Sequence, residues 1–114
     1  MTDLLNKKCV PCEGGVAPFD ISEIHKYQKK VDGWSLLENE KKKFFLEKNF
    51  KFQNFLESQN FVNEVGRISE LEGHHPDIKF GWGYATIAIT THSIEGLSEN
   101  DFILAAKIDK ITNV

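Results

Sequence analysis

The 114-residue sequence predicts a two-layer α+β domain, in which helices pack on one face of a four-stranded antiparallel sheet. Three segments repeat apolar residues with the period of about 3.6 that marks an amphipathic helix. Four shorter segments alternate apolar and polar residues, as half-buried strands do. The predicted order is α-ββ-α-ββ-α. One layer of helices on one sheet face is the simplest arrangement that buries all these apolar surfaces.

Residues 1–18 are predicted to form an irregular N-terminal arm, and residues 19–114 the single domain. The arm holds both cysteines, Cys9 and Cys12, and two of the three prolines, without a helical or strand period. We expect it to be dispensable for folding. A structural role is the favoured interpretation of the cysteine pair. A metal site or a redox motif is the alternative, although a second cysteine pair and a βαβ context are both missing.

The first helix is predicted to begin after Asp20, a favourable N-cap, and to end at Asp32-Gly33. Strands over residues 34–38 and 43–52 follow, and the short polar link between them predicts a hairpin. Lys48 is the exception on the apolar side of the second strand. The buried face of the helix is expected to comprise Ile21, Ile24, Tyr27 or Gln28, and Val31.

A longer helix is expected from Gln53 to Gly73, because glycine readily adopts the positive φ of a helix C-cap. A second hairpin is expected over residues 78–92. Trp82, at its turn, is interpreted as a core residue. The apolar stripe of the helix is expected to contain Phe55, Phe61, Val62, Val65 and Ile68.

The last helix is predicted to begin after Ser98, which has capping-box spacing to Asp101. Because the helices cover one face, a sheet face or a free edge would remain exposed, and we expect a homo-oligomer, either a dimer or a tetramer. The buried side of this helix is expected to contain Leu104, Ala105, Ile108 and Ile111.

Composition argues against several classes of function. A net charge of −3 disfavours direct nucleic-acid binding, which needs a clustered basic face. The one basic run, Lys41-Lys42-Lys43, is interpreted as a solvated turn. No segment approaches the ~20 apolar residues of a membrane span, and the first residues lack an apolar signal core. We therefore expect a cytoplasmic protein.

His74 and His75 are adjacent, between Gly73 and Pro76, at the expected corner between the long helix and the following strand. Imidazole titrates near neutral pH and is well suited to proton transfer. His92 stands at the expected end of the last strand. Taken alone, each signal is weak, because histidines in turns are often structural or partial metal ligands.

The histidines belong to a longer spaced motif, which consists of Glu70-x-x-x-His74-His75-Pro76, an aromatic residue at Trp82, His92 and Asp101. With this motif, the sequence resembles the pterin-4a-carbinolamine dehydratases over residues 20–112. The resemblance implies the fold predicted above. It also implies dehydration of a 4a-hydroxytetrahydropterin to the quinonoid dihydropterin, which recycles the cofactor of aromatic amino acid hydroxylases. It implies no metal, flavin or nucleotide, with the pterin as substrate and a hydroxylase as a possible partner.

Carried over by position, His74 and His92 are the proton-transfer residues, in roles of acid and base that the sequence leaves open. His75 would hold or polarise the pterin. Asp101 would cap its helix and orient His92. The implied pterin-binding side chains are Glu70, Thr90 and Thr91, with Asp101 beside them.

The sequence departs from the family pattern at two positions. Asn100 stands where many members have arginine, and Gly73 where some have a polar residue. Some members also bind and dimerise a homeodomain transcription factor. A non-catalytic protein-interaction module on the same fold is therefore the alternative function, and a metal protein using histidine and cysteine ligands is a further one.

Overall fold

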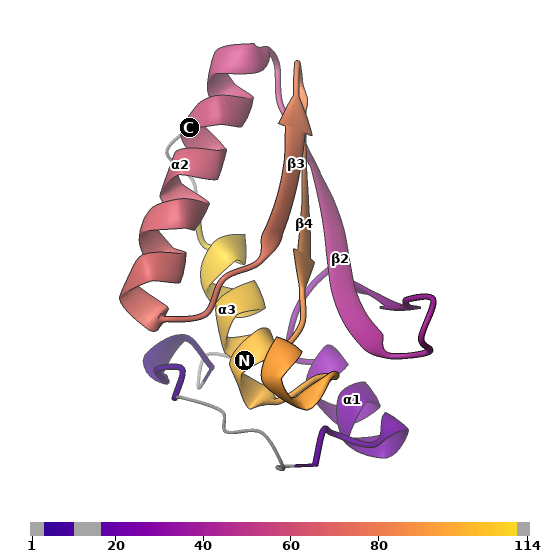
Figure 1. Ribbon diagram of the computed structural model, residues 1–114. Helices are drawn as coiled ribbons and strands as arrows, with labels where there is room; N and C mark the ends of the chain where they lie inside the picture. The colour runs from indigo at the N-terminus through magenta and orange to yellow at the C-terminus, as the bar shows by residue number, and fades with distance from the viewer. Residues whose placement is uncertain (1–3, 11–16, 112–114) are drawn as a thin grey trace.

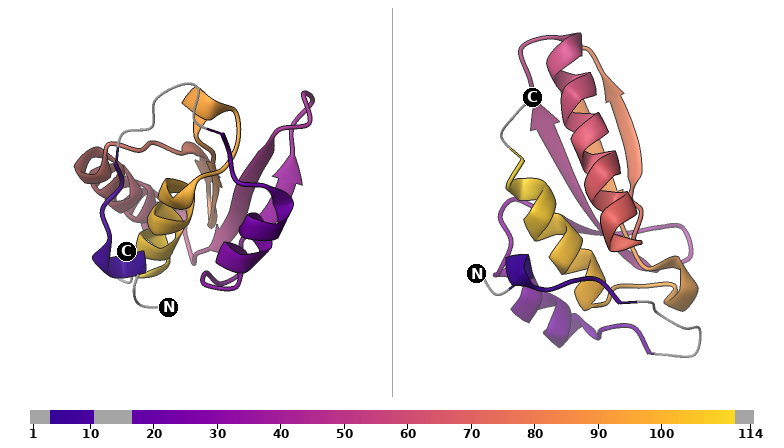
Figure 2. Two further views of the ribbon diagram at one scale, coloured as in Figure 1. Left: turned by 90° about the horizontal axis from the view of Figure 1, so that it is seen from below. Right: turned by 90° about the vertical axis from the view of Figure 1, so that its left-hand side faces the viewer.

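The computed structural model describes residues 4–10 and 17–111 and confirms the α+β prediction. The strands form one antiparallel sheet in the order β1-β2-β4-β3, and α2 and α3 lie on the same face of it (Figures 1 and 2). No helix in the described ranges is long and apolar enough to cross a membrane. The elements are the 3₁₀ turn η1 (Leu4–Asn6), α1 (Ile21–Gln28), β1 (Ser35–Glu38), β2 (Phe44–Lys51), α2 (Phe55–Glu72), β3 (Asp77–Gly81), β4 (Tyr84–Ile89), the 3₁₀ turn η2 (His92–Ile94) and α3 (Glu99–Asp109).

The register of the sheet explains why alternate residues reach the core. Leu46 of β2 pairs with Ile89 of β4, and both side chains are fully buried between the sheet and the helices. Ile87, two residues earlier in β4, is buried on the same face, as strand alternation requires. Helix α3 supplies the opposite side of the core. Its buried apolar residues are Phe102, Ile103, Leu104, Ala105, Ala106 and Ile108.

Lys48 has a specific compensation for its place on the helix-facing side of β2. Its ammonium donates a hydrogen bond to Asp109 Oδ1 at 2.9 Å and another to the carbonyl of Asp32 at 2.6 Å. The indole N–H of Trp34 donates to the same carboxylate, at 3.0 Å to Oδ2. A partly buried charge is tolerated when it is paired and hydrogen-bonded. This network joins β2, the segment before β1 and the end of α3.

Helix α1 begins as predicted and ends earlier than predicted. Asp20 Oδ1 accepts the backbone N–H of Glu23 at 2.9 Å, which confirms the N-cap. The helix ends at Gln28, where the side-chain amide donates to Trp34 O at 3.0 Å and draws the chain back toward the sheet. Ile24 is fully buried as expected. Ile21 is 46% exposed, so its assignment to the buried face was wrong.

Helix α2 ends at Gly73 as predicted, with φ of 66° and its N–H donating to Ser69 O. The core assignment of Trp82 was wrong, since this side chain is 70% exposed. Trp82 lies in the β3–β4 turn, outside the strand whose alternation would have placed it. Phe55, the first residue of α2, is also exposed, and its ring packs on Phe80 of β3 with centroids 5.7 Å apart.

The described part of the arm packs onto the domain. Leu4 is fully buried and Cys9 nearly so, both within the same core as the sheet and α3. The backbone N–H of Cys9 donates to Glu72 Oε1 at 2.8 Å. This packing conflicts with the expectation that the arm is dispensable, because deletion would remove core contacts. Cys12 lies outside the described residues.

Candidate functional site

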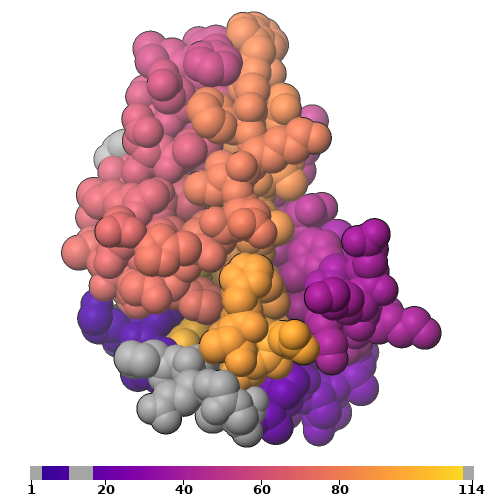
Figure 3. All heavy atoms as spheres, viewed as in Figure 1, coloured from indigo at the N-terminus to yellow at the C-terminus, as the bar shows by residue number. Residues whose placement is uncertain are grey.

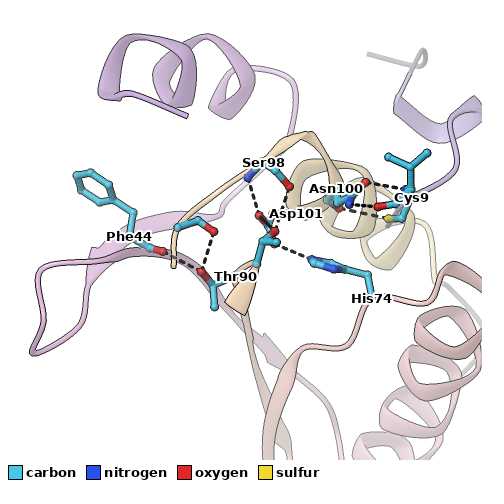
Figure 4. A network of polar contacts seen from close by, with 10 residues as sticks. Cys9, Phe44, His74, Thr90, Ser98, Asn100 and Asp101 are labelled. Atoms are coloured by element: carbon cyan, nitrogen blue, oxygen red, sulfur yellow. Dashed lines mark hydrogen bonds and ion pairs between the residues drawn. The ribbon is translucent and has the colours of Figure 1, made fainter. Parts of the chain in front are cut away.

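Asp101 is the buried centre of the site. Its Oδ2 accepts the backbone N–H of Ser98 at 2.8 Å, which confirms the capping box, and the hydroxyl of Thr91 at 2.7 Å. Its Oδ1 is 2.7 Å from His74 Nε2. Figure 4 shows Asp101 between Ser98 and His74. The expectation that Asp101 orients His92 was wrong: the histidine that it orients is His74.

These contacts select a tautomer of His74. An ionised Asp101 can only accept hydrogen bonds: Oδ2 takes those of Thr91 and Ser98, and Oδ1 is left for His74, which in this pairing carries its hydrogen on Nε2. Nδ1 is then the ring nitrogen that can take up a proton. A carboxylate placed in this way fixes the ring and stabilises the imidazolium once it forms, as in other acid–base sites.

The two adjacent histidines have different surroundings. The His74 side chain is 13% exposed, whereas that of His75 is 58% exposed. His75 is hydrogen-bonded to the carboxylate of Glu70, which lies in the last turn of α2. Gly73 produces this arrangement, because its left-handed conformation turns the chain out of the helix immediately before the pair. His74 is thereby directed inward to Asp101, and His75 stays at the surface.

His92 reaches the site from a different segment than His74 and His75, the turn η2 that follows β4. Strand β4 ends at Ile89, earlier than the sequence suggested, and His92 begins the 3₁₀ turn η2. Thr91 pairs with Gly96 across this turn. Because Thr91 also bonds to Asp101, the residue next to His92 is tied to the carboxylate that holds His74.

The three histidines line a single cavity of about 340 Å³. This size lies near the lower end of the roughly 300–1,000 Å³ typical of small-molecule sites, and suits a small ligand. The remaining lining residues are Val10, Gly73, Thr90, Thr91, Ser93 and Asn100.

The structure gives the other predicted site residues specific partners. Glu70 is not among the residues that line the cavity, and its carboxylate pairs with His75. The Thr90 hydroxyl lies within hydrogen-bonding distance of two carbonyl oxygens, Phe44 O at 3.0 Å and Gly96 O at 3.1 Å, and its single hydrogen is shared between them. The Thr91 hydroxyl donates to Asp101. Pterin binding by Glu70, Thr90 and Thr91 stays a prediction. Although both threonine hydroxyls donate to protein groups, their oxygens can still accept hydrogen bonds from a ligand.

Sequence reasoning missed the arm as part of the cavity wall. The Asn100 side chain accepts the Val10 N–H at 3.0 Å and donates to Val10 O at 2.6 Å, a pairing like that of two strands. Asn100 is almost fully buried. One hint of this contact was present in the sequence, namely that Asn100 stands where many family members have arginine. The arm itself offered none, because it has no periodic pattern.

Cys9 has the properties of a structural cysteine. Burial, together with the nearby Glu72 carboxylate, raises the pKa of its thiol to about 12. The thiolate is the form that binds metals and attacks disulfides, so neutral pH disfavours both roles for Cys9. Within the described ranges, no group of three histidine, cysteine or acidic side chains is arranged to hold a metal ion.

Comparisons of the sequence with known proteins agree on one family. The family model described as Pterin 4 alpha carbinolamine dehydratase matches residues 17–111. A protein of Rubrobacter xylanophilus is 44% identical over 111 residues, covering 97% of this chain and 100% of that protein. A protein of Halorhodospira halophila is 49% identical over 108 residues, covering 95% and 96%. Both carry pterin-4-alpha-carbinolamine dehydratase as a provisional name.

Solved structures share the fold. A transcriptional coactivator/pterin dehydratase from Brucella melitensis superposes with a TM-score of 0.74 at 24% identity, covering 81% of this chain and 95% of that one. A pterin dehydratase-like protein, described as a RuBisCO assembly factor in the alpha-carboxysome, superposes with a TM-score of 0.57 at 26% identity, covering 68% and 86%. From the family match over residues 17–111 and the close relatives, the chain belongs to the pterin-4-alpha-carbinolamine dehydratase family.

Proposed function

We propose that the protein converts a 4a-hydroxytetrahydropterin to the quinonoid dihydropterin and water, and so recycles the cofactor of aromatic amino acid hydroxylases. The observation that supports this most strongly is the cavity lined by His74, His75 and His92, with His74 held by the buried carboxylate of Asp101. Family membership supports a pterin as the ligand.

The reaction requires one proton to be given and one to be taken. The C4a–oxygen bond breaks, and the hydroxyl leaves as water after receiving a proton from an acid. A base removes a ring N–H proton, and the released electron pair forms the new carbon–nitrogen double bond. Positioned acids and bases typically contribute ~10²–10⁴-fold each, which is adequate for an unstable carbinolamine.

The environment of each histidine suggests its role. His74 is suited to be the base, because Nδ1 can take up the proton while Asp101 stabilises the resulting charge. His92, which lines the cavity from a different segment, is then the acid. His75 and its partner Glu70 lie at the exposed mouth and are suited to binding the pterin ring. No bound metal enters this scheme.

A non-catalytic interaction module is the second candidate. Two structural neighbours are described as a transcriptional coactivator/pterin dehydratase and as a RuBisCO assembly factor, which supports a partner-binding role for this fold. The paired His74 and Asp101 favour the enzyme, since a buried carboxylate that orients a cavity histidine has no evident use in an interaction surface.

The decisive experiment adds the purified protein to an aromatic amino acid hydroxylase reaction and follows decay of the 4a-carbinolamine by absorbance. We expect catalytic amounts of protein to accelerate the decay, and dialysis against a strong chelator to leave the rate unchanged. The control is the folded His74→Ala/His92→Ala variant. Decay at the uncatalysed rate with the wild-type protein would favour the interaction module.

A further inference from the structure

A second, smaller hollow adjoins the histidine cavity. It has a volume of about 200 Å³ and shares two of its lining residues, Thr90 and His92, with the first. Figure 3 shows the β1–β2 turn, in magenta, beside the orange segment that follows β4. The remaining lining residues are Asn39, Lys41, Lys43 and Glu95.

The turn that carries the lysines is fixed by several hydrogen bonds. Asn39 Oδ1 accepts the backbone N–H groups of Lys41 at 2.8 Å and Lys43 at 3.1 Å. The backbone N–H of Lys42 donates to Asn39 O at 2.9 Å, and Lys42 itself adopts a φ of 62°. The run was interpreted as a solvated turn, and all three lysines are indeed exposed. Lys41 and Lys43 nevertheless line the hollow, whereas Lys42 does not.

Thr90 lies at the boundary between the two hollows and connects the segments on either side of it. Its hydroxyl contacts the carbonyl of Phe44, at the start of β2, and that of Gly96, after η2 (Figure 4). The strand that follows the lysine turn and the segment that carries His92 are therefore joined at the boundary between the hollows. A ligand whose ring lies among the histidines could extend a substituent past Thr90 and His92 toward the lysines.

The charge of the second hollow favours an anion. Its lining includes two lysines, Lys41 and Lys43, and one acidic residue, Glu95, whose Oε1 lies 3.9 Å from Lys43 Nζ. An ion pair this long and this exposed contributes little, so a ligand anion could replace Glu95 as the partner of Lys43. We propose that this hollow is a subsite for an anionic substituent on the pterin, with a phosphate ester as the chemical class that fits. This inference rests on the proposed pterin-binding function of the adjacent cavity.

Equilibrium binding of two probes tests the subsite without relying on turnover. The probes are 7,8-dihydroneopterin and its 3′-phosphate, which share the ring and differ only in the phosphate. At low ionic strength we expect the wild-type protein to bind the phosphate ester about five- to tenfold more tightly, with the difference shrinking in high salt. In the Lys41→Gln/Lys43→Gln variant the two probes should bind equally.

Two further variants control for general charge effects. Lys42→Gln removes one positive charge from the same turn, but from outside the hollow, and should keep most of the preference. Glu95→Gln removes the competing carboxylate and should increase the preference for the phosphate ester. Equal binding of the probes by the wild-type protein, or an equal loss in Lys42→Gln and in the double variant, would overturn the subsite alone. Failure of both probes to bind would overturn the pterin site as well.

Discussion

Replacing Asp101 with asparagine should disable the site while keeping its shape. The carboxylate accepts hydrogen bonds on both oxygens, from Thr91 and Ser98 on one side and from His74 on the other. Asparagine has one acceptor oxygen and one donor NH₂ group. If the oxygen keeps the helix cap, the NH₂ group faces His74 Nε2, and two donors then oppose each other. His74 must change tautomer to restore the bond, which places its hydrogen on Nδ1.

The expected loss in rate follows from that tautomer. With Nδ1 already protonated, His74 can no longer act as the base, and the charge that stabilised its imidazolium is also absent. We expect kcat to fall by roughly 10²–10⁴, equivalent to about 3–5 kcal/mol in the barrier, with a smaller change in KM. Because Asp101 is fully buried, imperfect satisfaction should also lower the unfolding free energy by about 1–3 kcal/mol.

The assay compares kcat and KM for carbinolamine dehydration, with folding checked by circular dichroism. Thr91→Ser is the matched control, because it keeps the hydroxyl that donates to Asp101 and should retain most of kcat. Thr91→Val removes that donor and should give an intermediate loss. A folded Asp101→Asn protein whose kcat stays within about threefold of wild type would refute the assigned role of the His74–Asp101 pair.

Three further predictions concern the arm and the mouth of the cavity. Leu4→Ala should lower the unfolding free energy by about 2–4 kcal/mol in chemical denaturation, whereas the exposed Val10→Ala should change it by less than about 0.5 kcal/mol; equal effects would contradict the arm's core role. The Cys9 thiol has a folded-state pKa raised from 9.0 to about 12, so the unfolded chain loses this proton first as pH rises. Stability should therefore fall faster between pH 9 and pH 11 in wild type than in Cys9→Ala, by at most about 1.4 kcal/mol per pH unit, and parallel curves would count against the burial of the thiol. His75→Ala should raise KM with little change in kcat, and a dominant loss of kcat would assign His75 to proton transfer.

Local patterns predicted much of this fold. The caps at Asp20, Gly73 and Ser98 were predicted correctly, because each depends on residues within a few positions of itself. The core assignment of Trp82 failed because the residue lies in a turn, where alternation no longer determines the direction of a side chain.

Long-range contacts left no comparable pattern. His74 and Asp101 are 27 positions apart, and no periodicity indicates that they touch. Val10 and Asn100 are 90 positions apart, in an arm and a helix that sequence reasoning treated as separate. The family motif selected the histidines, but the pairing of Asp101 with His92 that was inferred from the resemblance was wrong, because the fold brings His74 to Asp101. Self-association stays a prediction.

The most direct test of the proposed chemistry is the rate of 4a-carbinolamine decay with the wild-type protein and with the folded His74→Ala/His92→Ala variant. The two histidines line the cavity from different segments, and the variant loses both proton-transfer groups together. We expect the wild-type protein to accelerate decay in proportion to its concentration, and the double variant to give nearly the uncatalysed rate. Decay by the double variant at close to the wild-type rate would contradict the dehydratase mechanism.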